Sequence, residues 1–290
     1  LAVNFLEADA VTLASGRVKI GKEVIESSPK LKMIQRTGVG LDSIDLDVLE
    51  EKQIPLYVNT GINSDSVAEH AILLILAALR RLTTIDAQVK SGVWIKQGNG
   101  IKNRELKGKT VGIIGMGHIG RKVARILSAF EARIVYTDVC RTPEDFEKKY
   151  DITYMQLADL LAESDVVTLH CPLTEENRNL FDRKAFEGMK RDAIIVNTAR
   201  GGLIEEQSLV YALEQNIIAG AALDVFASEP LTKDSPLLKF DNVILTPHIG
   251  GVTYDSFKAM MKGAMYNIDS FHNGRLGEIE DRKYNLKKQL

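Results

Sequence analysis

The segment from Gly115 to Gly120 constrains the fold of this chain more than any other part of the sequence. It reads Gly-Met-Gly-His-Ile-Gly, follows the apolar run 111–114, and precedes residues 119–130, in which apolar side chains recur at helical spacing. This order predicts a strand, a tight turn and a helix. Gly115 allows the sharp turn, Gly117 lets the backbone approach a pyrophosphate, and Gly120 lets the helix pack closely on the strand. The N–H groups at the start of the helix would then hold the anion.

The residues after this helix identify the ligand more closely. Residues 133–137 predict a second strand, and Asp138 follows it at the distance of roughly 20 residues that dinucleotide-binding sequences show. A carboxylate at this place accepts hydrogen bonds from a ribose 2′-OH and repels a 2′-phosphate. We therefore expect NAD rather than NADP. The alternative is a glycine-rich turn without a ligand.

Strand and helix patterns alternate along the rest of the chain. Six apolar strands are predicted at 111–114, 134–136, 166–169, 194–196, 221–225 and 243–245. Continuous apolar strands between helices indicate a parallel sheet covered on both faces, which is the doubly wound α/β fold of the Rossmann type. Before it, strands at 10–14, 31–35 and 54–58 and a helix at 45–52 predict a smaller α/β unit. We expect one long helix over 66–90 and a last helix over 254–271.

The composition argues against several classes of protein. The 290 residues are 45% hydrophobic and 26% charged, with a formal net charge of −2, so we expect neither nucleic acid nor a membrane surface as a partner. The longest apolar run, residues 71–79, is much shorter than the roughly 20 residues that span a bilayer. No secretory signal is visible, and Cys140 and Cys171 cannot build a disulfide framework. We therefore expect a cytoplasmic location.

Three residues with acid–base or anion-binding side chains follow predicted strands of the large sheet. Arg200 comes after 194–196, Glu229 after 221–225, and His248 after 243–245. Because ligands of such sheets bind at the carboxyl ends of the strands, these side chains are expected beside the glycine loop. His248 is the candidate proton donor, Glu229 would hold the other ring N–H, and Arg200 offers a planar fork for a carboxylate. Each residue taken singly could be a surface or structural group, whereas their common placement favours a site.

The other histidines carry less weight. His118 lies inside the glycine loop, where its backbone N–H matters more than its ring. His170 precedes a segment that we interpret as the wall of an adenine pocket, and His70 and His272 lie on helical patterns as structural or exposed residues. No spacing of Cys, His and carboxylate residues predicts a metal site.

With these motifs, the chain resembles the NAD-dependent D-2-hydroxyacid dehydrogenases, and in particular their phosphoglycerate dehydrogenase branch. The resemblance covers nearly the whole chain. It is carried by Gly38-Val39-Gly40-Leu41-Asp42, Ser66-Val67-Ala68-Glu69, the glycine loop with Asp138, Leu169-His170-Cys171-Pro172-Leu173-Thr174, residues 197–202, Leu223-Asp224-Val225-Phe226 with Glu229-Pro230, and Pro247-His248-Ile249-Gly250-Gly251.

The resemblance implies a role for each residue of the site. Arg200, Glu229 and His248 carry over as catalytic residues. The substrate contacts are the backbone N–H groups of Val39 and Gly40 together with Arg200, and Arg36 could serve an anion. The implied cofactor contacts are Gly115, Gly117, His118, Ile119 and Gly120 around the pyrophosphate, Asp138 on the ribose, Cys171 on the adenine side, and Thr198, Ala199, Asp224 and Gly250 near the nicotinamide.

The resemblance also implies the domain organisation. A flavodoxin-like substrate domain is expected from residues 1–91 and 252–290, and the Rossmann cofactor domain, residues 92–251, is inserted into it. The family is usually dimeric, so we expect a homodimer.

The substrate is less constrained than the reaction. The implied reaction moves a hydride between NAD(H) and a D-2-hydroxy acid/2-oxo acid pair, with 3-phosphoglycerate/phosphohydroxypyruvate as the first candidate. However, phosphoglycerate dehydrogenases usually carry Arg-Ser where this chain has Ala14-Ser15, which weakens the case for a phosphorylated substrate. A hydroxypyruvate/glyoxylate reductase is one alternative. An NAD-sensing binding protein of the corepressor type is another, from a different functional class.

Overall fold

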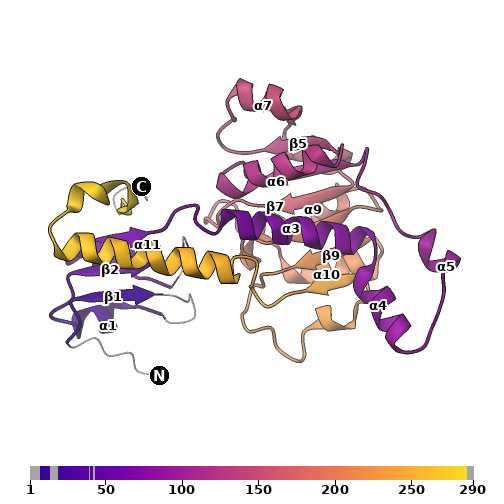
Figure 1. Ribbon diagram of the computed structural model, residues 1–290. Helices are drawn as coiled ribbons and strands as arrows, with labels where there is room; N and C mark the ends of the chain where they lie inside the picture. Colours follow the sequence, from indigo (N-terminus) through magenta and orange to yellow (C-terminus); the bar gives the residue numbers. More distant parts are fainter. Residues whose placement is uncertain (1–6, 14–18, 39, 42, 286–290) are drawn as a thin grey trace. The chain divides into compact units, whose positions relative to one another are not determined.

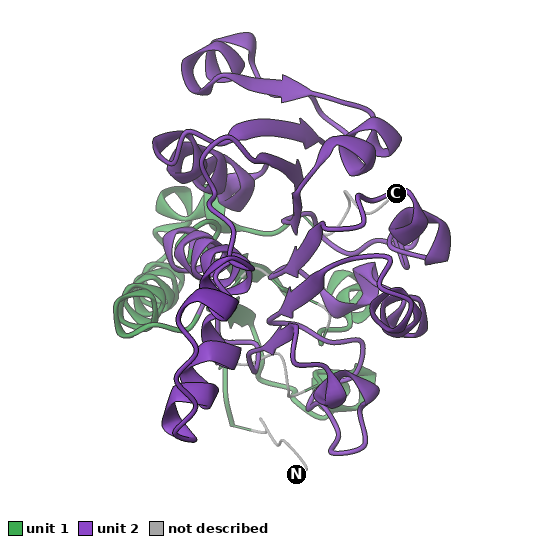
Figure 2. Cartoon of the chain, turned by 90° about the vertical axis from the view of Figure 1, so that its right-hand side faces the viewer, with its two compact units in different colours: residues 1–63, 252–290 green, residues 64–251 purple. Residues whose placement is uncertain are grey.

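The chain forms two compact units. The computed structural model describes residues 7–13, 19–38, 40–41 and 43–285. Unit 1 comprises residues 1–63 and 252–290, and unit 2 comprises residues 64–251 (Figure 2). The first boundary therefore lies near residue 63, whereas the sequence predicted it near residue 91. The physical reason is that the helix beginning at Ser64 buries Ala68, Ala71 and Ile75 in the core of unit 2.

Unit 1 contains a three-stranded parallel sheet. Its strands β1 (Ala10–Leu13), β2 (Met33–Arg36) and β3 (Leu56–Val58) are hydrogen-bonded in that order. Helices α1 (Lys22–Glu26) and α2 (Leu46–Glu51) connect them, and the Asp45 carboxylate caps α2 by accepting the N–H of Val48. These elements agree with the predicted positions to within a few residues, except that Ala14 lies outside the described residues.

The chain returns to unit 1 through α11 (Tyr254–His272), close to the predicted bounds. Buried amides hold this helix to the sheet. The Asn267 side-chain N–H donates to Gln35 Oε1 at 2.8 Å, and the Asn59 amide donates to the Met260 carbonyl at 3.0 Å. Since burying these amides without partners would be costly, the pairs specify how α11 packs on β2. Two short 3-10 turns, η3 (Leu276–Glu278) and η4 (Glu280–Arg282), follow.

Unit 2 is built on a seven-stranded parallel sheet with the order β10-β9-β8-β7-β4-β5-β6. Its sequence begins in the middle of the sheet, winds outward to β6, and then crosses to β7 on the other side of β4. This confirms the doubly wound fold, and it places the expected ligand crevice at the carboxyl ends of β4 and β7. The strands are β4 (Thr110–Ile114), β5 (Arg133–Thr137), β6 (Ile152–Tyr154), β7 (Val166–Leu169), β8 (Ile194–Asn197), β9 (Gly220–Leu223) and β10 (Val243–Leu245).

Helices cover the two faces of this sheet. Ile113 and Val196 pack in the core under α3 and α6, which lie side by side on one face (Figure 1), whereas Ile114 and Ile195 pack in the core of the other face. Side chains of successive strand residues therefore pack into the cores on opposite faces of the sheet. The helices and turns are α3 (Ser64–Leu79), α4 (Leu82–Lys90), α5 (Gln97–Gly100), α6 (His118–Ala129), α7 (Glu144–Tyr150), α8 (Leu157–Glu163), α9 (Arg183–Glu187), α10 (Glu206–Glu214), η1 (Gly201–Leu203) and η2 (Pro236–Lys239).

Two elements differ from the prediction. The helix expected over 66–90 is broken between α3 and α4, because Arg81 adopts a left-handed conformation with φ of 51°. Strand β6 was not predicted, since it has only three residues and only Ile152 among them is buried. Neither difference changes the strands that carry the predicted site.

The turn between β4 and α6 explains two of the glycines by close contact. Gly115 has φ of +96°, a conformation that side chains disfavour. A Cβ on Gly120 would lie 2.0 Å from the Gly115 carbonyl oxygen, so only glycine lets the first turn of α6 pack there. A Cβ on Gly117, in contrast, meets no atom within 4 Å. The protein thus leaves open space beside Gly117 and none beside Gly120.

This difference gives a matched pair of variants. Gly120→Ala should lower the free energy of unfolding by about 1–3 kcal/mol, the usual cost of overpacking, because the added methyl group meets backbone. Gly117→Ala should leave it within about 0.5 kcal/mol of the unmodified chain. Urea unfolding of both variants without cofactor measures this. Equal losses in the two variants would contradict the packing argument.

Candidate active site

The glycine loop presents the start of α6 at the carboxyl edge of the sheet. Gly117 is the N-cap residue and supplies no side-chain cap to the helix. His118 is exposed, and Ile119 is half-buried. The first N–H groups of an α-helix have no partner inside the helix, so this end can receive an anion. The open space beside Gly117 fits the approach of a pyrophosphate, as the sequence predicts.

Asp138 follows β5 and is half-buried. One carboxylate oxygen accepts the N–H of Met116 at 2.5 Å, and the other accepts the N–H of Cys140 at 3.0 Å. These bonds tie the end of β5 to the glycine loop. Because a carboxylate has about four acceptor positions, Asp138 keeps capacity for the hydroxyls of a ribose.

The residues predicted from the sequence to line the cofactor site follow the ends of β7 and β8. Cys171 is half-buried, and burial raises the pKa of its thiol to about 11, with a smaller contribution from Asp138. Burial lowers the pKa of His170 to about 3, so its ring is neutral at physiological pH. Thr198 Oγ1 is buried and has no hydrogen-bond partner among the residues that the structure describes. This orphaned hydroxyl fits a site in which a bound molecule supplies the missing partner.

Arg200 lies in the loop between β8 and η1 and is half-buried. Its Nη1 donates to the Ala199 carbonyl at 2.7 Å, and its own carbonyl accepts the Asn197 side-chain N–H at 2.8 Å. Asn197 also accepts the N–H of Ala199 at 3.0 Å. The buried Asn197 side chain thus shapes the loop that carries the guanidinium.

Glu229 and His248 form a direct pair. His248 Nδ1 lies 2.8 Å from Glu229 Oε2, and the other oxygen of Glu229 accepts the N–H of Phe226 at 3.1 Å. The His248 side chain is 49% exposed, which leaves its ring accessible to a small molecule. A carboxylate on Nδ1 selects the tautomer in which that nitrogen carries a proton, so Nε2 is the nitrogen available for chemistry.

The loops of Arg200 and Glu229 are held together by backbone contact. A Cβ on Gly201 would lie 1.9 Å from the carbonyl carbon of Phe226, so the chain after Arg200 touches the chain before Glu229. Because β8, β9 and β10 are neighbours in the sheet, the loops bearing Arg200, Glu229 and His248 follow one another along the same edge. The structure therefore assembles at the carboxyl edge of unit 2 the three residues that the sequence selected.

Asp224 anchors the segment that carries His248. Its carboxylate is buried and accepts the Thr246 hydroxyl at 2.6 Å and the N–H groups of Ile249 and Gly250 at 2.9 and 2.8 Å. Burial alone would raise the pKa of Asp224, but hydrogen bonds from His70, Thr246 and the two amides outweigh it and lower the pKa. The contact of Asp224 and Gly250 with a nicotinamide stays a prediction.

This segment is under local strain. His248 has φ of 56°, a left-handed conformation that costs roughly 1–2 kcal/mol for a residue with a side chain. Strain of this kind persists only when surrounding contacts determine the conformation. Sequence reasoning missed two of those contacts. Thr246 bonds to Asp224, and His70, interpreted from the sequence as merely structural or exposed, lies 3.1 Å from Thr246.

The predicted substrate contacts of unit 1 lie at the end of β2 and in the loop after it. Arg36 is buried, and its guanidinium donates to the carbonyls of Leu13 and Gly40 at 2.8 and 2.9 Å. It thereby shapes the loop after β2 in which Gly40 lies. Val39 lies outside the described residues. The role of this loop in binding a carboxylate stays a prediction.

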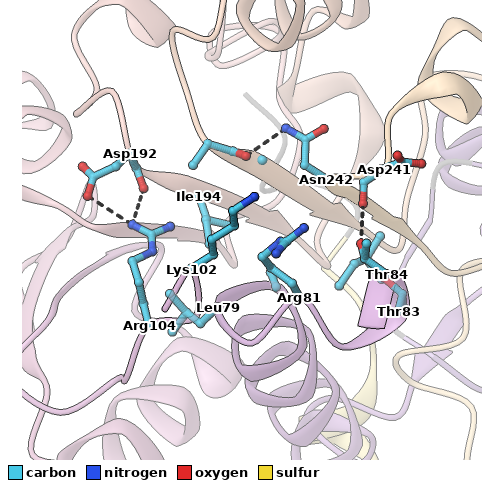
Figure 3. Close-up of a pocket in the computed structure, with 14 residues that line it drawn as sticks. Leu79, Arg81, Thr83, Thr84, Lys102, Arg104, Asp192, Ile194, Asp241 and Asn242 are labelled. Atoms are coloured by element: carbon cyan, nitrogen blue, oxygen red, sulfur yellow. Dashed lines mark hydrogen bonds and ion pairs between the residues drawn. The ribbon is translucent and has the colours of Figure 1, made fainter. Parts of the chain in front are cut away.

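A cavity of about 300 Å³ lies at the opposite edge of the large sheet, at the amino ends of β8, β9 and β10 (Figure 3). Arg81, Lys102 and Arg104 contribute to its wall, and Arg104 pairs with Asp192. It contains none of the residues selected from the sequence. Ligands of doubly wound sheets bind at the carboxyl ends of the strands, so we do not place the active site there.

The described residues provide neither a metal-binding cluster nor a membrane-spanning helix. They contain no group of three or more His, Cys, Asp or Glu side chains placed to hold a metal ion. Within the same part of the chain, every helix is too short or too polar to cross a membrane.

Comparison with known proteins identifies the family. Residues 72–250 match the model of the D-isomer specific 2-hydroxyacid dehydrogenase NAD binding domain. This match begins inside α3 and ends at Gly250, so it covers most of unit 2. It includes the glycine loop, Asp138 and the three predicted catalytic residues.

Two similar curated proteins have different activities. Glyoxylate reductase of Thermofilum pendens is 39% identical over 260 residues, which cover 89% of this chain and 77% of that protein. D-3-phosphoglycerate dehydrogenase of Archaeoglobus fulgidus is 41% identical over 249 residues, which cover 86% of this chain and 46% of that protein. The chain thus spans about half the length of this second relative.

Solved structures agree with this result. D-lactate dehydrogenase from Aquifex aeolicus, complexed with NAD and lactic acid, superposes with a TM-score of 0.88 at 31% identity, covering 96% of this chain and 87% of that one. An acyclic imino acid reductase in complex with NADPH and D-Arg superposes with a TM-score of 0.85 at 28% identity, covering 97% and 87%. The chain belongs to the D-isomer specific 2-hydroxyacid dehydrogenases, a family of NAD-dependent oxidoreductases.

Proposed function

We propose that this protein reduces a small, unphosphorylated 2-oxo acid of the glyoxylate or hydroxypyruvate type to the D-2-hydroxy acid, with NADH as the hydride donor. The observation that carries this proposal is the pair of His248 and Glu229 at the carboxyl edge of the sheet, on the same edge as the glycine loop. Such a pair supplies the proton that the reduction of a carbonyl needs.

His248 is the proton donor in this proposal. A hydride that reaches the carbonyl carbon leaves negative charge on the carbonyl oxygen, and the Nε2 proton of the imidazolium neutralises it. Glu229 accepts the Nδ1–H and so keeps that proton in place and Nε2 directed away from the carboxylate. After transfer the ring is neutral and still donates its Nδ1–H to Glu229. The reverse reaction uses the same ring as a base.

Arg200 binds and polarises the substrate. Its guanidinium matches the geometry of a carboxylate and places positive charge beside the oxygen on which charge develops. Asn197 and the contact of Gly201 with Phe226 restrict the loop, so the guanidinium is partly preorganised. NAD, when bound, supplies or accepts the hydride, and the start of α6 with Asp138 would hold its pyrophosphate and ribose.

The environment of Arg36 favours an unphosphorylated substrate. Its guanidinium already donates to two backbone carbonyls of unit 1. The position where phosphoglycerate dehydrogenases usually carry arginine is Ala14 here, which lies outside the described residues. Proteins similar to this chain include the glyoxylate reductase of Thermofilum pendens, at 39% identity, and the D-3-phosphoglycerate dehydrogenase of Archaeoglobus fulgidus. Oxidation of 3-phosphoglycerate remains the second candidate because that relative is 41% identical.

We also propose that the protein works as a homodimer. The segment of α4 and α5 exposes several large apolar side chains, among them Trp94 at 81% and Ile101 at 83%. Large apolar side chains exposed within one segment of a globular protein favour an interaction surface there. A second copy of the chain is the partner that the resemblance implies.

Replacing His248 tests the proton donor. His248→Asn should lower kcat by about 10²–10⁴-fold, the usual contribution of a general acid, because asparagine cannot deliver a proton. The dissociation constant of NADH should change less than about threefold, since the ring has no predicted part in cofactor binding. Steady-state kinetics and NADH fluorescence titration measure both. A collapse of NADH affinity with little loss of kcat would show that His248 is structural.

Replacing Asp138 tests the preference for NAD. Asp138→Ala should reduce the ratio of kcat/KM for NADH over NADPH by about tenfold or more, because the ribose loses an acceptor and the repulsion of a 2′-phosphate disappears. Asp138→Asn is the matched control, since its side-chain oxygen can still accept the N–H of Met116 without the charge. An unchanged ratio in both variants would remove Asp138 from cofactor selection.

Oxidation of NADH with a panel of 2-oxo acids tests the substrate. Glyoxylate or hydroxypyruvate should exceed phosphohydroxypyruvate in kcat/KM by about tenfold or more, because the Arg36 guanidinium already donates to two carbonyls and Ala14 carries no charge. Pyruvate and 2-oxoglutarate complete the panel. A preference for phosphohydroxypyruvate would support the second candidate. Binding of NADH without turnover of any acid would favour the non-enzymatic alternative.

A further inference from the structure

We propose that His70 of α3 is a positioning residue for His248, acting through Thr246 and Asp224. The inference rests on the proposed function, in which His248 donates the proton. His70 does not belong to the strand-end motifs, and it reaches them from the helix that covers one face of the sheet. All the residues concerned belong to unit 2.

The protons in this contact can be assigned from the geometry. Thr246 Oγ1 lies 2.6 Å from Asp224 Oδ1 and 3.1 Å from His70 Nε2. The low pKa of Asp224 keeps it a carboxylate, which accepts only, so the single hydroxyl proton of Thr246 points to Asp224. The hydroxyl oxygen must then accept from His70. His70 therefore carries a proton on Nε2, and the chain of donors runs from His70 to Thr246 to Asp224.

Asp224 connects these hydrogen bonds to the segment around His248. Its two oxygens accept the N–H groups of Ile249 and Gly250, directly after His248. On the other side, the His248 N–H donates to the Thr246 carbonyl at 3.0 Å. His248 thus lies between two anchored positions, and its strained backbone conformation depends on both.

His70 is largely buried and lies close to both Asp224 and Gly250. Its side chain is only 13% exposed, and Nε2 also lies 3.4 Å from Asp224 Oδ1. A Cβ on Gly250 would meet Asp224 Oδ2 at 3.0 Å and His70 Cδ2 at 3.2 Å. Glycine at this position therefore lets the segment after His248 pack against the acid and the imidazole together. Without the donor at His70, the Thr246 hydroxyl and the Asp224 carboxylate would each lose a hydrogen-bond partner.

Two substitutions of His70 separate positioning from packing. His70→Leu fills similar space without a donor, whereas the side-chain amide of His70→Gln can donate from near the position of Nε2. His70→Leu should lower kcat about tenfold, the factor expected for the loss of one hydrogen bond to a charged network. KM for the oxo acid and the dissociation constant of NADH should change less than about threefold. His70→Gln should recover kcat to within about threefold of the unmodified enzyme.

A second route tests the same chain of bonds if His70→Leu does not fold. Thr246→Val removes the hydroxyl that links His70 to Asp224 and should lower kcat by a similar factor. His272→Leu is the matched control, since His272 is also a helical histidine near a carboxylate, 3.5 Å from Asp9 in unit 1, and its kcat should be unchanged.

Two results would overturn the inference. One is an unchanged kcat in His70→Leu and Thr246→Val while His248→Asn is inactive, which leaves the proposed function standing. The other is equal loss of kcat in His70→Leu and His70→Gln, which would mean that the imidazole serves packing alone. Full activity of His248→Asn would instead reject the proposed function itself, so the two failures are distinguishable.

Discussion

The buried carboxylate of Asp224 is the contact on which the candidate site depends most. It lies at the end of β9 and satisfies a hydroxyl and two amides of the segment that follows β10. A charge placed so deeply is tolerated only because every donor is in position. The same hydrogen bonds hold the backbone around His248 in its left-handed conformation. Stability of the loop and orientation of the ring are consequently two results of one set of bonds.

The remaining groups are brought together by backbone contacts that only small residues permit. The loop after β8 touches the turn after β9 at Gly201, and α6 touches the preceding turn at Gly120. Parallel strands deliver the loops to one edge, but these contacts determine how near the loops come to one another. The sheet therefore explains why the residues are neighbours, and the glycines explain how closely their loops pack.

The sequence was sufficient for the features that have a local signature. The glycine loop, the strand ending before Asp138, and the strand-end positions of Arg200, Glu229 and His248 could all be predicted because each depends on residues adjacent in the chain. The break at Arg81 and the short strand β6 leave no such signal. The amphipathic pattern of α3 indicates burial but does not say in which unit. His70 could not be identified, since its partner Thr246 lies 176 residues away.

The raised pKa of the Cys171 thiol has a consequence for how the enzyme withstands oxidation. Peroxides and alkylating agents attack the thiolate form of cysteine, and burial raises the pKa of this thiol to about 11, so it is protonated at neutral pH. Cys140, in contrast, is exposed. Under oxidative stress, damage should therefore begin at the surface and spare the wall that we assign to the cofactor. The exposed thiol nevertheless lies beside the same site, because the Cys140 N–H donates to Asp138, so a reagent that reaches Cys140 acts next to the carboxylate that we assign to the ribose.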